Sequence, residues 1–149
     1  MQIDLIVIGK LKEKYWRDAV AEYSKRLSRF CKLEVIELPD APDGADAMAV
    51  EAKKILPRIQ GVCVPLCVEG EKTDSEGFAR FIADCAVKGQ SHITFIIGGS
   101  SGLDNQVKAK ANWRLSFSDM TFPHQLMRVV LLEQLYRAFK INANESYHK

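Results

Sequence analysis

Short β-rich runs alternate with segments of helical period along the chain, and this alternation is the strongest constraint on its fold. Strands are expected in five places: Gln2–Ile8, Leu33–Leu38, Gly61–Val68, His92–Ile97 and Arg114–Phe117. Two of these runs are apolar almost throughout, which is typical of strands that helices cover on both faces. The sequence therefore predicts an α/β fold with a mostly parallel sheet flanked by helices.

Helices are expected between the strands and after the last one. The predicted helices are Tyr15–Phe30, Ala47–Ile59 with Asp46 as N-cap, a helix capped by Asp74 or Ser75 and ending at Val87, a short helix from Asp104 to about Ala111, and His124–Lys140. Pro39–Gly44 is the clearest loop. Pro65 has no backbone N–H to donate, so it predicts an edge or an irregularity in the third strand.

The length and composition indicate one soluble domain over residues 1–149. The chain has a mass of 16.8 kDa and is 47% hydrophobic and 27% charged, which excludes a disordered tail or a disulfide miniprotein. No apolar run is long enough to span a membrane, and no basic segment precedes the first strand, so we expect a cytoplasmic protein. Its four cysteines are then reduced, and the spacing of Cys63 and Cys67 fits neither a zinc nor a redox motif. No metal is expected.

The last predicted helix is apolar around nearly its whole circumference. A helix of this kind must be buried on more than one side, and a chain of this size has difficulty covering it alone. We therefore expect a homodimer. The apolar residues are Leu126, Met127, Val129, Val130, Leu131, Leu132, Leu135, Tyr136 and Phe139.

The charges are unevenly distributed although the formal net charge is only +2. Residues 10–32 hold eight basic and three acidic side chains. Residues 33–79 hold four basic and ten acidic ones, and residues 80–149 hold nine basic and five acidic ones. This pattern is compatible with one positive face that binds nucleic acid, and equally with an ordinary solvated helix surface.

The glycine-rich segment Gly98–Gly102 follows the most hydrophobic strand and precedes a helix. Open α/β sheets bind ligands at this place, the carboxyl end of a strand, and glycines let a ligand approach the backbone. No Lys-Ser or Lys-Thr follows, so the segment is not a P-loop. A ligand-binding turn and a plain tight turn both remain open from this motif alone.

A second loop, Ser116–Pro123, leads directly into the apolar helix. Its helix carries His124 and Arg128 one turn apart, and Glu133 and Arg137 one turn apart on the other side. The second pair can be an ordinary helix ion pair. Charged side chains on so apolar a helix need partners or a ligand, which favours a functional role for Arg137 and leaves His124 open.

The chain ends in Tyr147-His148-Lys149. Terminal residues usually fray, so an untethered tail is one interpretation. The other is that these side chains stack on a base, titrate near neutral pH and contact phosphate.

Together these segments resemble one family. The segment Gly98–Gly102 (GG-x-x-G), the segment Ser116–Ala138 (S-x-S-x-M-T-x-P-H-Q-L-x-R-V-x-L-x-E-Q-L-Y-R-A) and the terminal Y-H-K are similar to the ribosomal large subunit methyltransferase H family of SPOUT-class enzymes. The resemblance covers the whole chain. It implies a C-terminal trefoil knot, an obligate homodimer, and methylation by S-adenosylmethionine of N3 of a pseudouridine in helix 69 of bacterial 23S rRNA in the ribosome.

The resemblance also implies which residues form the cofactor pocket. This chain departs from the family pattern at two positions. Cys67 occupies a position where aspartate is common, and Ser146 occupies one where proline is common. The matching pocket residues are Leu66, Gly99, Ser118, Asp119, Met120, Thr121, Phe122 and Pro123.

The catalytic candidates follow from the chemistry that the family implies. Methyl transfer from a sulfonium needs positioning and charge stabilisation and no metal. Arg137 can stabilise the anion of the base, His148 or Glu133 can accept its proton, and Tyr147 can stack on the nucleoside. His124 is a further candidate. Two alternatives stay open: a SPOUT enzyme for another RNA base, and a non-catalytic ribosome-binding module.

Overall fold

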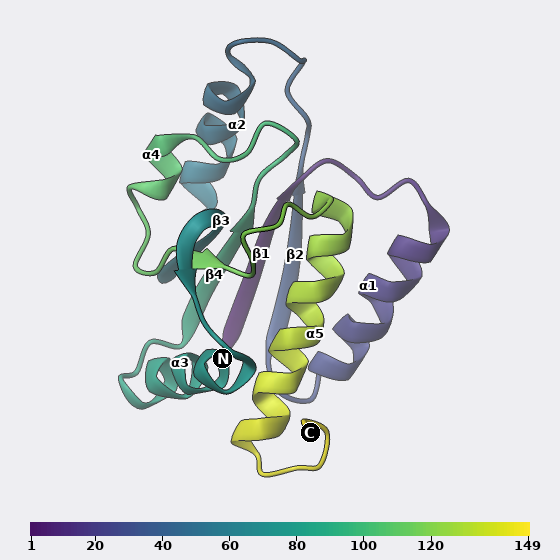
Figure 1. Cartoon of the computed structure of the whole chain (residues 1–149), viewed down its shortest axis with the longest axis vertical. Coiled ribbons are helices and arrows are strands. Elements are labelled where there is room, and N and C mark those ends of the chain that lie inside the picture. Colours follow the sequence, from purple (N-terminus) through teal and green to yellow (C-terminus); the bar gives the residue numbers. More distant parts are fainter.

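Five strands and five α-helices alternate along the computed structural model, which describes residues 1–149. The strands are β1 (Gln2–Ile8), β2 (Lys32–Leu38), β3 (Val62–Lys72), β4 (His92–Ile97) and β5 (Leu115–Ser116). The helices are α1 (Lys14–Leu27), α2 (Ala47–Ile55), α3 (Ser75–Val87), α4 (Asn105–Lys108) and α5 (His124–Asn142), and a 3₁₀ turn (Leu56–Arg58) continues α2. All strands are parallel, in the order β2-β1-β4-β3-β5 (Figure 1). The predicted α/β fold is confirmed.

Two separate apolar clusters cover the two faces of the sheet. Alternate residues of one strand point to opposite faces. Accordingly, Leu5 and Val7 pack with α1, α3 and α5, whereas Ile6 and Ile8 pack with α2 and α4. The sheet thus lies between two helical layers, and α5 crosses the central strands on the first face (Figure 1).

β3 is longer than predicted and irregular in its middle. It pairs with β4 only from Val62 to Pro65, and beyond this point both Leu66 and Glu71 pair with Leu115 of β5, so the register shifts. The irregularity expected at Pro65 is confirmed. The extension to Lys72 was not predicted, because its polar residues are held by the neighbouring β5 and not by an apolar pattern.

The helix boundaries follow their capping groups in part. Asp74 accepts a hydrogen bond from the Gly77 N–H at 2.7 Å, and Asp104 accepts one from the Gln106 N–H at 2.8 Å. Asp46 stands at the N-cap position of α2, but its side chain makes no capping hydrogen bond. α2 ends before Pro57, because proline cannot donate the next helical hydrogen bond, and not at Ile59 as predicted.

α5 is covered on several sides by its own chain. No residue from His124 to Ile141 is exposed, because α1 and α3 flank the helix above the sheet. Leu132 is fully buried, and the Phe139 ring stacks on Phe30 with centroids 5.6 Å apart. One chain therefore covers more of this helix than its sequence pattern suggested. The homodimer and the knotted path stay predictions of the family resemblance.

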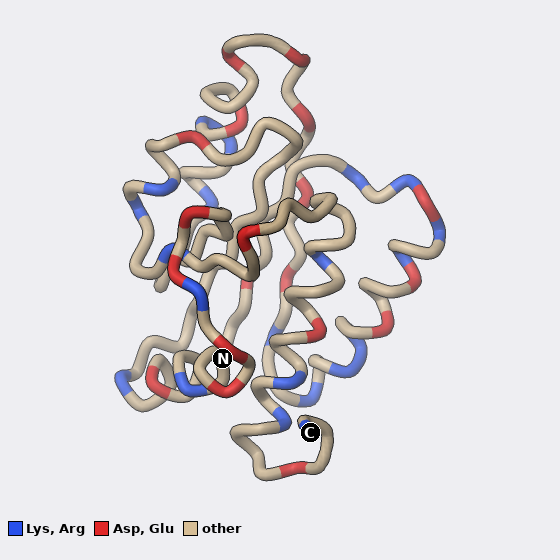
Figure 2. Tube along the Cα trace, viewed as in Figure 1, with Lys and Arg blue, Asp and Glu red and all other residues tan.

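Charges of both signs lie along α1 (Figure 2). Lys14 pairs with Asp18 at 2.6 Å, and Arg26 pairs with Glu22 at 2.7 Å, each one helical turn apart. Exposed pairs of this kind contribute little to stability, but they neutralise part of the basic segment. No helix combines the length and apolar character needed to cross a membrane. No three His, Cys, Asp or Glu side chains gather where they would hold a metal ion.

Candidate active site

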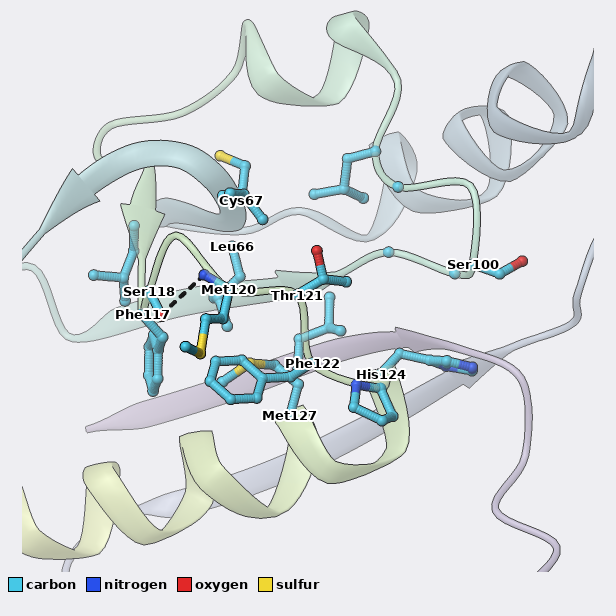
Figure 3. Close-up of a pocket in the computed structure, with 18 of the residues that line it drawn as sticks. Leu66, Cys67, Ser100, Phe117, Ser118, Met120, Thr121, Phe122, His124 and Met127 are labelled. Atoms are coloured by element: carbon cyan, nitrogen blue, oxygen red, sulfur yellow. Dashed lines mark hydrogen bonds between the residues drawn. The ribbon is translucent and has the colours of Figure 1, made fainter.

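A pocket of about 650 Å³ lies at the carboxyl ends of β4 and β5 and beside the middle of β3, just after β3 stops pairing with β4. Three segments surround it: Leu66–Glu69 of β3, the glycine turn that follows β4, and the segment between β5 and the first turn of α5 (Figure 3). About half of the lining residues are hydrophobic. This volume and composition are typical of sites that bind a small organic ligand.

The glycine turn is shaped by two close approaches of its backbone. A Cβ on Gly98 would lie 2.8 Å from both the carbonyl carbon and the oxygen of Gly102, so only glycine fits there. Gly102 has a φ of +84° and donates its N–H to the Gly99 carbonyl at 3.0 Å. The turn therefore needs its glycines for its own geometry.

Gly99 lines the pocket, as predicted, but its missing side chain would point elsewhere. A Cβ on Gly99 would meet Oε1 of the buried Glu51 and Cγ2 of Ile8, each at 3.3 Å. A side chain at Gly99 would therefore point toward α2 and β1, and the role of Gly99 in cofactor binding stays a prediction. A larger residue would press on Glu51 and Ile8 and displace the turn indirectly.

The loop between β5 and α5 forms the wall opposite the glycine turn. Ser118 accepts a hydrogen bond from the Met120 N–H at 3.0 Å, and its own carbonyl accepts one from the Ser116 hydroxyl at 3.1 Å (Figure 3). These bonds fix the loop. Asp119 is not among the residues lining the pocket, because its exposed carboxylate pairs with Lys72 of β3 at 2.5 Å. All the other predicted cofactor residues line the pocket, namely Leu66, Gly99, Ser118, Met120, Thr121, Phe122 and Pro123.

His124 lines the pocket from the first turn of α5. Burial, and next to it the positive charge of Arg128, lower the pKa of His124, so its imidazole is neutral at pH 7. Its Nδ1 atom is buried and has no hydrogen-bond partner.

Arg128, one turn further along α5, is used to hold the backbone. It is 1% exposed, and its NH2 group donates to the carbonyls of Ile8 and Gly9, both at 2.8 Å. Its NH1 group donates to Glu37 at 3.1 Å. Arg128 therefore joins α5 to the ends of β1 and β2 and leaves the pocket to His124.

The lining of the pocket contains no unpaired cation. Its one lysine, Lys108, forms an ion pair with Glu69, and His124 is neutral. The other lining residues are uncharged. A ligand with an apolar body and a positive charge would meet no repulsion here.

The remaining catalytic candidates form a second cluster near the C-terminus of α5. Arg137 donates to both carboxylate oxygens of Glu133, at 3.2 and 2.8 Å, and the Tyr147 hydroxyl donates to the same carboxylate at 2.9 Å. The NH1 group of Arg137 lies 3.1 Å from Nδ1 of His148, and its guanidinium carbon lies 4.8 Å from the centre of the Tyr147 ring. These four side chains, which we call the tail cluster, act as one network.

The network fixes the protonation of Tyr147. Burial, and next to it the hydrogen bond to the Glu133 carboxylate, raise the pKa of Tyr147 to about 12. Its phenol is therefore protonated at neutral pH and can donate a hydrogen bond or stack on a base, but it cannot accept a proton.

The C-terminal tail is bound to the rest of the chain and does not fray as one interpretation expected. Besides the tail cluster, Glu145 pairs with Arg29 of the α1–β2 turn and with Lys140 of α5, the latter at 2.6 Å. The Tyr147 ring also meets Tyr136 edge to face, with centroids 4.9 Å apart.

The pocket and the tail cluster lie at opposite ends of α5. His124 begins the helix and Arg137 follows thirteen residues later, so about 20 Å of helix separates them. Figure 1 shows the chain turning back after α5, so that the C-terminus lies beside the far end of this helix. A single chain does not bring the predicted catalytic residues and the predicted cofactor pocket together.

Several lining residues were not predicted from the sequence. Glu69 and Lys108 are brought together by the unpredicted extension of β3. Gln125 lies beside His124 and could have been found as its neighbour in the same motif. Met127 and Leu115 also line the pocket, but nothing in the sequence distinguishes them from the apolar residues of the core.

Sequence comparisons agree on one kind of protein. The profile of a family described as "Predicted SPOUT methyltransferase" matches residues 1–148. Proteins named "Ribosomal RNA large subunit methyltransferase H" from Clostridium perfringens (strain 13 / Type A) and Bifidobacterium adolescentis are each 52% identical, over the full length of both chains. One from Streptococcus suis is 50% identical, also over both full lengths.

Solved structures with low sequence identity share the fold. A probable methylase family protein from Haemophilus influenzae has a TM-score of 0.59 at 14% identity, over 99% of this chain and 70% of its own. The tRNA (m1G37) methyltransferase from Aquifex aeolicus has a TM-score of 0.54 at 14% identity, over 92% of this chain and 70% of its own.

Proposed function

Because the chain belongs to the ribosomal RNA large subunit methyltransferase H family of SPOUT methyltransferases, we propose that it methylates 23S rRNA of the large ribosomal subunit with S-adenosylmethionine. The observation that carries this proposal is the pocket at the carboxyl ends of the parallel strands, whose walls are the three segments that the family motif predicts. The site proposed is N3 of a pseudouridine in helix 69.

The residues of the pocket fit S-adenosylmethionine. The apolar side chains of Leu66, Leu103 and Leu115 suit an adenine ring, and the backbone of the glycine turn offers polar groups at its edge. The cofactor supplies an electrophilic methyl group on a positively charged sulfur. The neutral imidazole of His124 and the paired Lys108 leave that charge unopposed.

The tail cluster supplies what the pocket lacks for the reaction. N3 of pseudouridine carries a proton between two carbonyl groups, and its loss leaves negative charge on those oxygens. The guanidinium of Arg137 stabilises that anion, while Glu133 positions Arg137 and Tyr147 through its hydrogen bonds. Nδ1 of His148 lies 3.1 Å from the NH1 group of Arg137, so His148 also helps to orient this guanidinium. The Glu133 carboxylate, which accepts from Arg137 and Tyr147, would take the N3 proton. S-adenosylmethionine, when bound, would supply the methyl group that N3 acquires.

We infer that the reaction needs a homodimer in which one subunit's tail cluster meets the other subunit's pocket. The distance along α5 between His124 and Arg137 supports this arrangement, because it separates donor and acceptor sites within one chain. A two-fold axis would place each tail cluster beside the partner's pocket.

The activity is tested on ribosomes from a strain that lacks this protein. We expect incubation with S-adenosylmethionine labelled in its methyl group to label 23S rRNA at one pseudouridine, identified by nuclease mapping and mass spectrometry. Labelling of another RNA or base would contradict the proposed substrate. No labelling of any RNA would contradict the enzyme.

The dimer is tested by mixing two inactive variants. Gly98→Val should disable the pocket, and deletion of Tyr147–Lys149 should disable the tail cluster while sparing cofactor binding. If each site forms between two subunits, random exchange of subunits should restore activity at about a quarter of all sites. Half of the dimers are then mixed, and each mixed dimer carries one intact site out of two. If pocket and tail act within one chain, mixing restores nothing.

A further inference from the structure

We propose that the connection from β1 to α1, together with the first turn of α1, binds the RNA next to the methylation site, with Lys10 and Lys12 on phosphates and Tyr15 stacked on an unpaired base. This inference rests on the proposed function and assigns it a second contact surface. We call Lys10–Arg17 the β1–α1 arm.

The first observation is the pattern of exposure along the arm. Lys10 and Lys12 are exposed, whereas Leu11 between them is 9% exposed and anchors the segment. The two lysines therefore face outward around a buried residue. Neither forms an ion pair, unlike Lys14, whose ammonium is paired with Asp18 at 2.6 Å. The acidic side chains in and next to the arm are Glu13 and Asp18. Asp18 forms the ion pair with Lys14, and Glu13 forms none.

The second observation is that other side chains hold the backbone of the arm in place. Arg17 donates to the carbonyls of Leu11 and Lys12. Arg128 holds the two residues just before the arm through the carbonyls of Ile8 and Gly9. Two cations are thus used to fix the arm, so Lys10 and Lys12 project from a rigid support and a ligand need not order the backbone.

The third observation is an aromatic ring in solvent among these charges. Tyr15 is 64% exposed and belongs to neither apolar cluster of the fold. It contacts Trp16 in an edge-to-face pair with ring centroids 5.1 Å apart, and most of its surface stays open to solvent. Folding gains little from such a ring, whereas single-stranded RNA is commonly held by exposed aromatic rings between basic side chains.

The arm lies on the same edge of the sheet as the pocket. It leaves the carboxyl end of β1, and the glycine turn leaves the carboxyl end of the adjacent β4. Arg128, which binds the first residues before the arm, stands one turn after the pocket residue His124. Figures 1 and 2 show the arm, with its basic residues, running from β1 past the start of α5 to α1. RNA that places a base at the pocket therefore passes close to Lys10 and Lys12.

The test measures binding to unmodified ribosomes and to deproteinised 23S rRNA at several salt concentrations. Lys10→Ala and Lys12→Ala should each lower the slope of log affinity against log salt by about 0.7–0.9, because each removes one phosphate contact. Lys88→Ala is the matched control, since it removes an exposed lysine at the opposite edge, just before β4. It should leave the slope unchanged.

Tyr15 is tested with a conservative partner. Tyr15→Ala should weaken RNA binding roughly 5- to 150-fold with little change in salt slope, and Tyr15→Phe should retain wild-type binding because the ring remains. All these variants should keep the wild-type rise in melting temperature with S-adenosylmethionine.

Three results would overturn this inference. The first is that Lys10→Ala and Lys12→Ala leave the salt slope unchanged, as Lys88→Ala should. The second is that Tyr15→Ala and Tyr15→Phe lose equal affinity for RNA. The third is that the arm variants lose affinity for ribosomes but not for free rRNA. The last would assign the arm to a ribosomal protein. Because binding is read without methylation, these outcomes are separate from a failure of the proposed activity.

Discussion

Replacing Arg128 by methionine should destabilise the protein strongly although this residue does not line the pocket. Methionine keeps much of the apolar stem, but the carbonyls of Ile8 and Gly9 lose their donor in a buried place. Each unsatisfied buried group costs about 1–3 kcal/mol. Glu37 is 36% exposed in its side chain, so its lost ion pair adds less than about 1 kcal/mol. The expected loss is about 2–6 kcal/mol, or roughly 5–20 °C in melting temperature.

Urea unfolding followed by circular dichroism measures this loss, at one fixed protein concentration because a dimer would couple stability to concentration. Glu37→Gln is the control, since it removes the charge of the partner and keeps an acceptor for Arg128. It should cost less than about 1 kcal/mol. An Arg128→Met protein as stable as Glu37→Gln would refute the view that the two carbonyls depend on this guanidinium.

Two further predictions concern the pocket. Gly98→Ala should abolish the rise in melting temperature caused by S-adenosylmethionine, because its Cβ would collide with the backbone of Gly102, whereas Ser101→Ala in the same turn should keep it. Since burial and Arg128 lower the pKa of His124, the unfolded chain binds this proton at a higher pH than the folded one. As the pH falls below about 6.5, the ordinary value, wild type should lose stability relative to His124→Gln, and parallel curves of urea midpoint against pH would contradict this.

The sequence located the strands well because they depend on local patterns. β-rich runs between turn residues identified every strand. The glycine turn and the loop before α5 were assigned to a cofactor pocket only through the family resemblance, because their position after strands left a plain turn equally open. What local patterns cannot give is the partner of a polar side chain. Asp119 was assigned to the pocket with its neighbours, yet Lys72, on an unpredicted part of β3, draws its carboxylate away.

Arg128 shows the same limit more clearly. Its spacing from His124 placed both side chains on one face of the helix and named no partner for Arg128. In the fold, the carboxyl ends of β1 and β2 meet this face of α5, and their carbonyls and Glu37 take up the guanidinium. The burial of a charge therefore depends on strand order, which no periodicity in this sequence reveals.

The hydrogen bonds between Arg128 and the end of β1 also affect the order in which the fold can be completed. One of them joins Arg128 to Ile8 across 120 residues, and β1 itself occupies the middle of the sheet between β2 and β4. At roughly 5–20 residues per second, the ribosome synthesises Arg128 about 10 s after Ile8. Until Arg128 has been synthesised, the carbonyls at the end of β1 lack this donor. Closure between residues so far apart in sequence is slow.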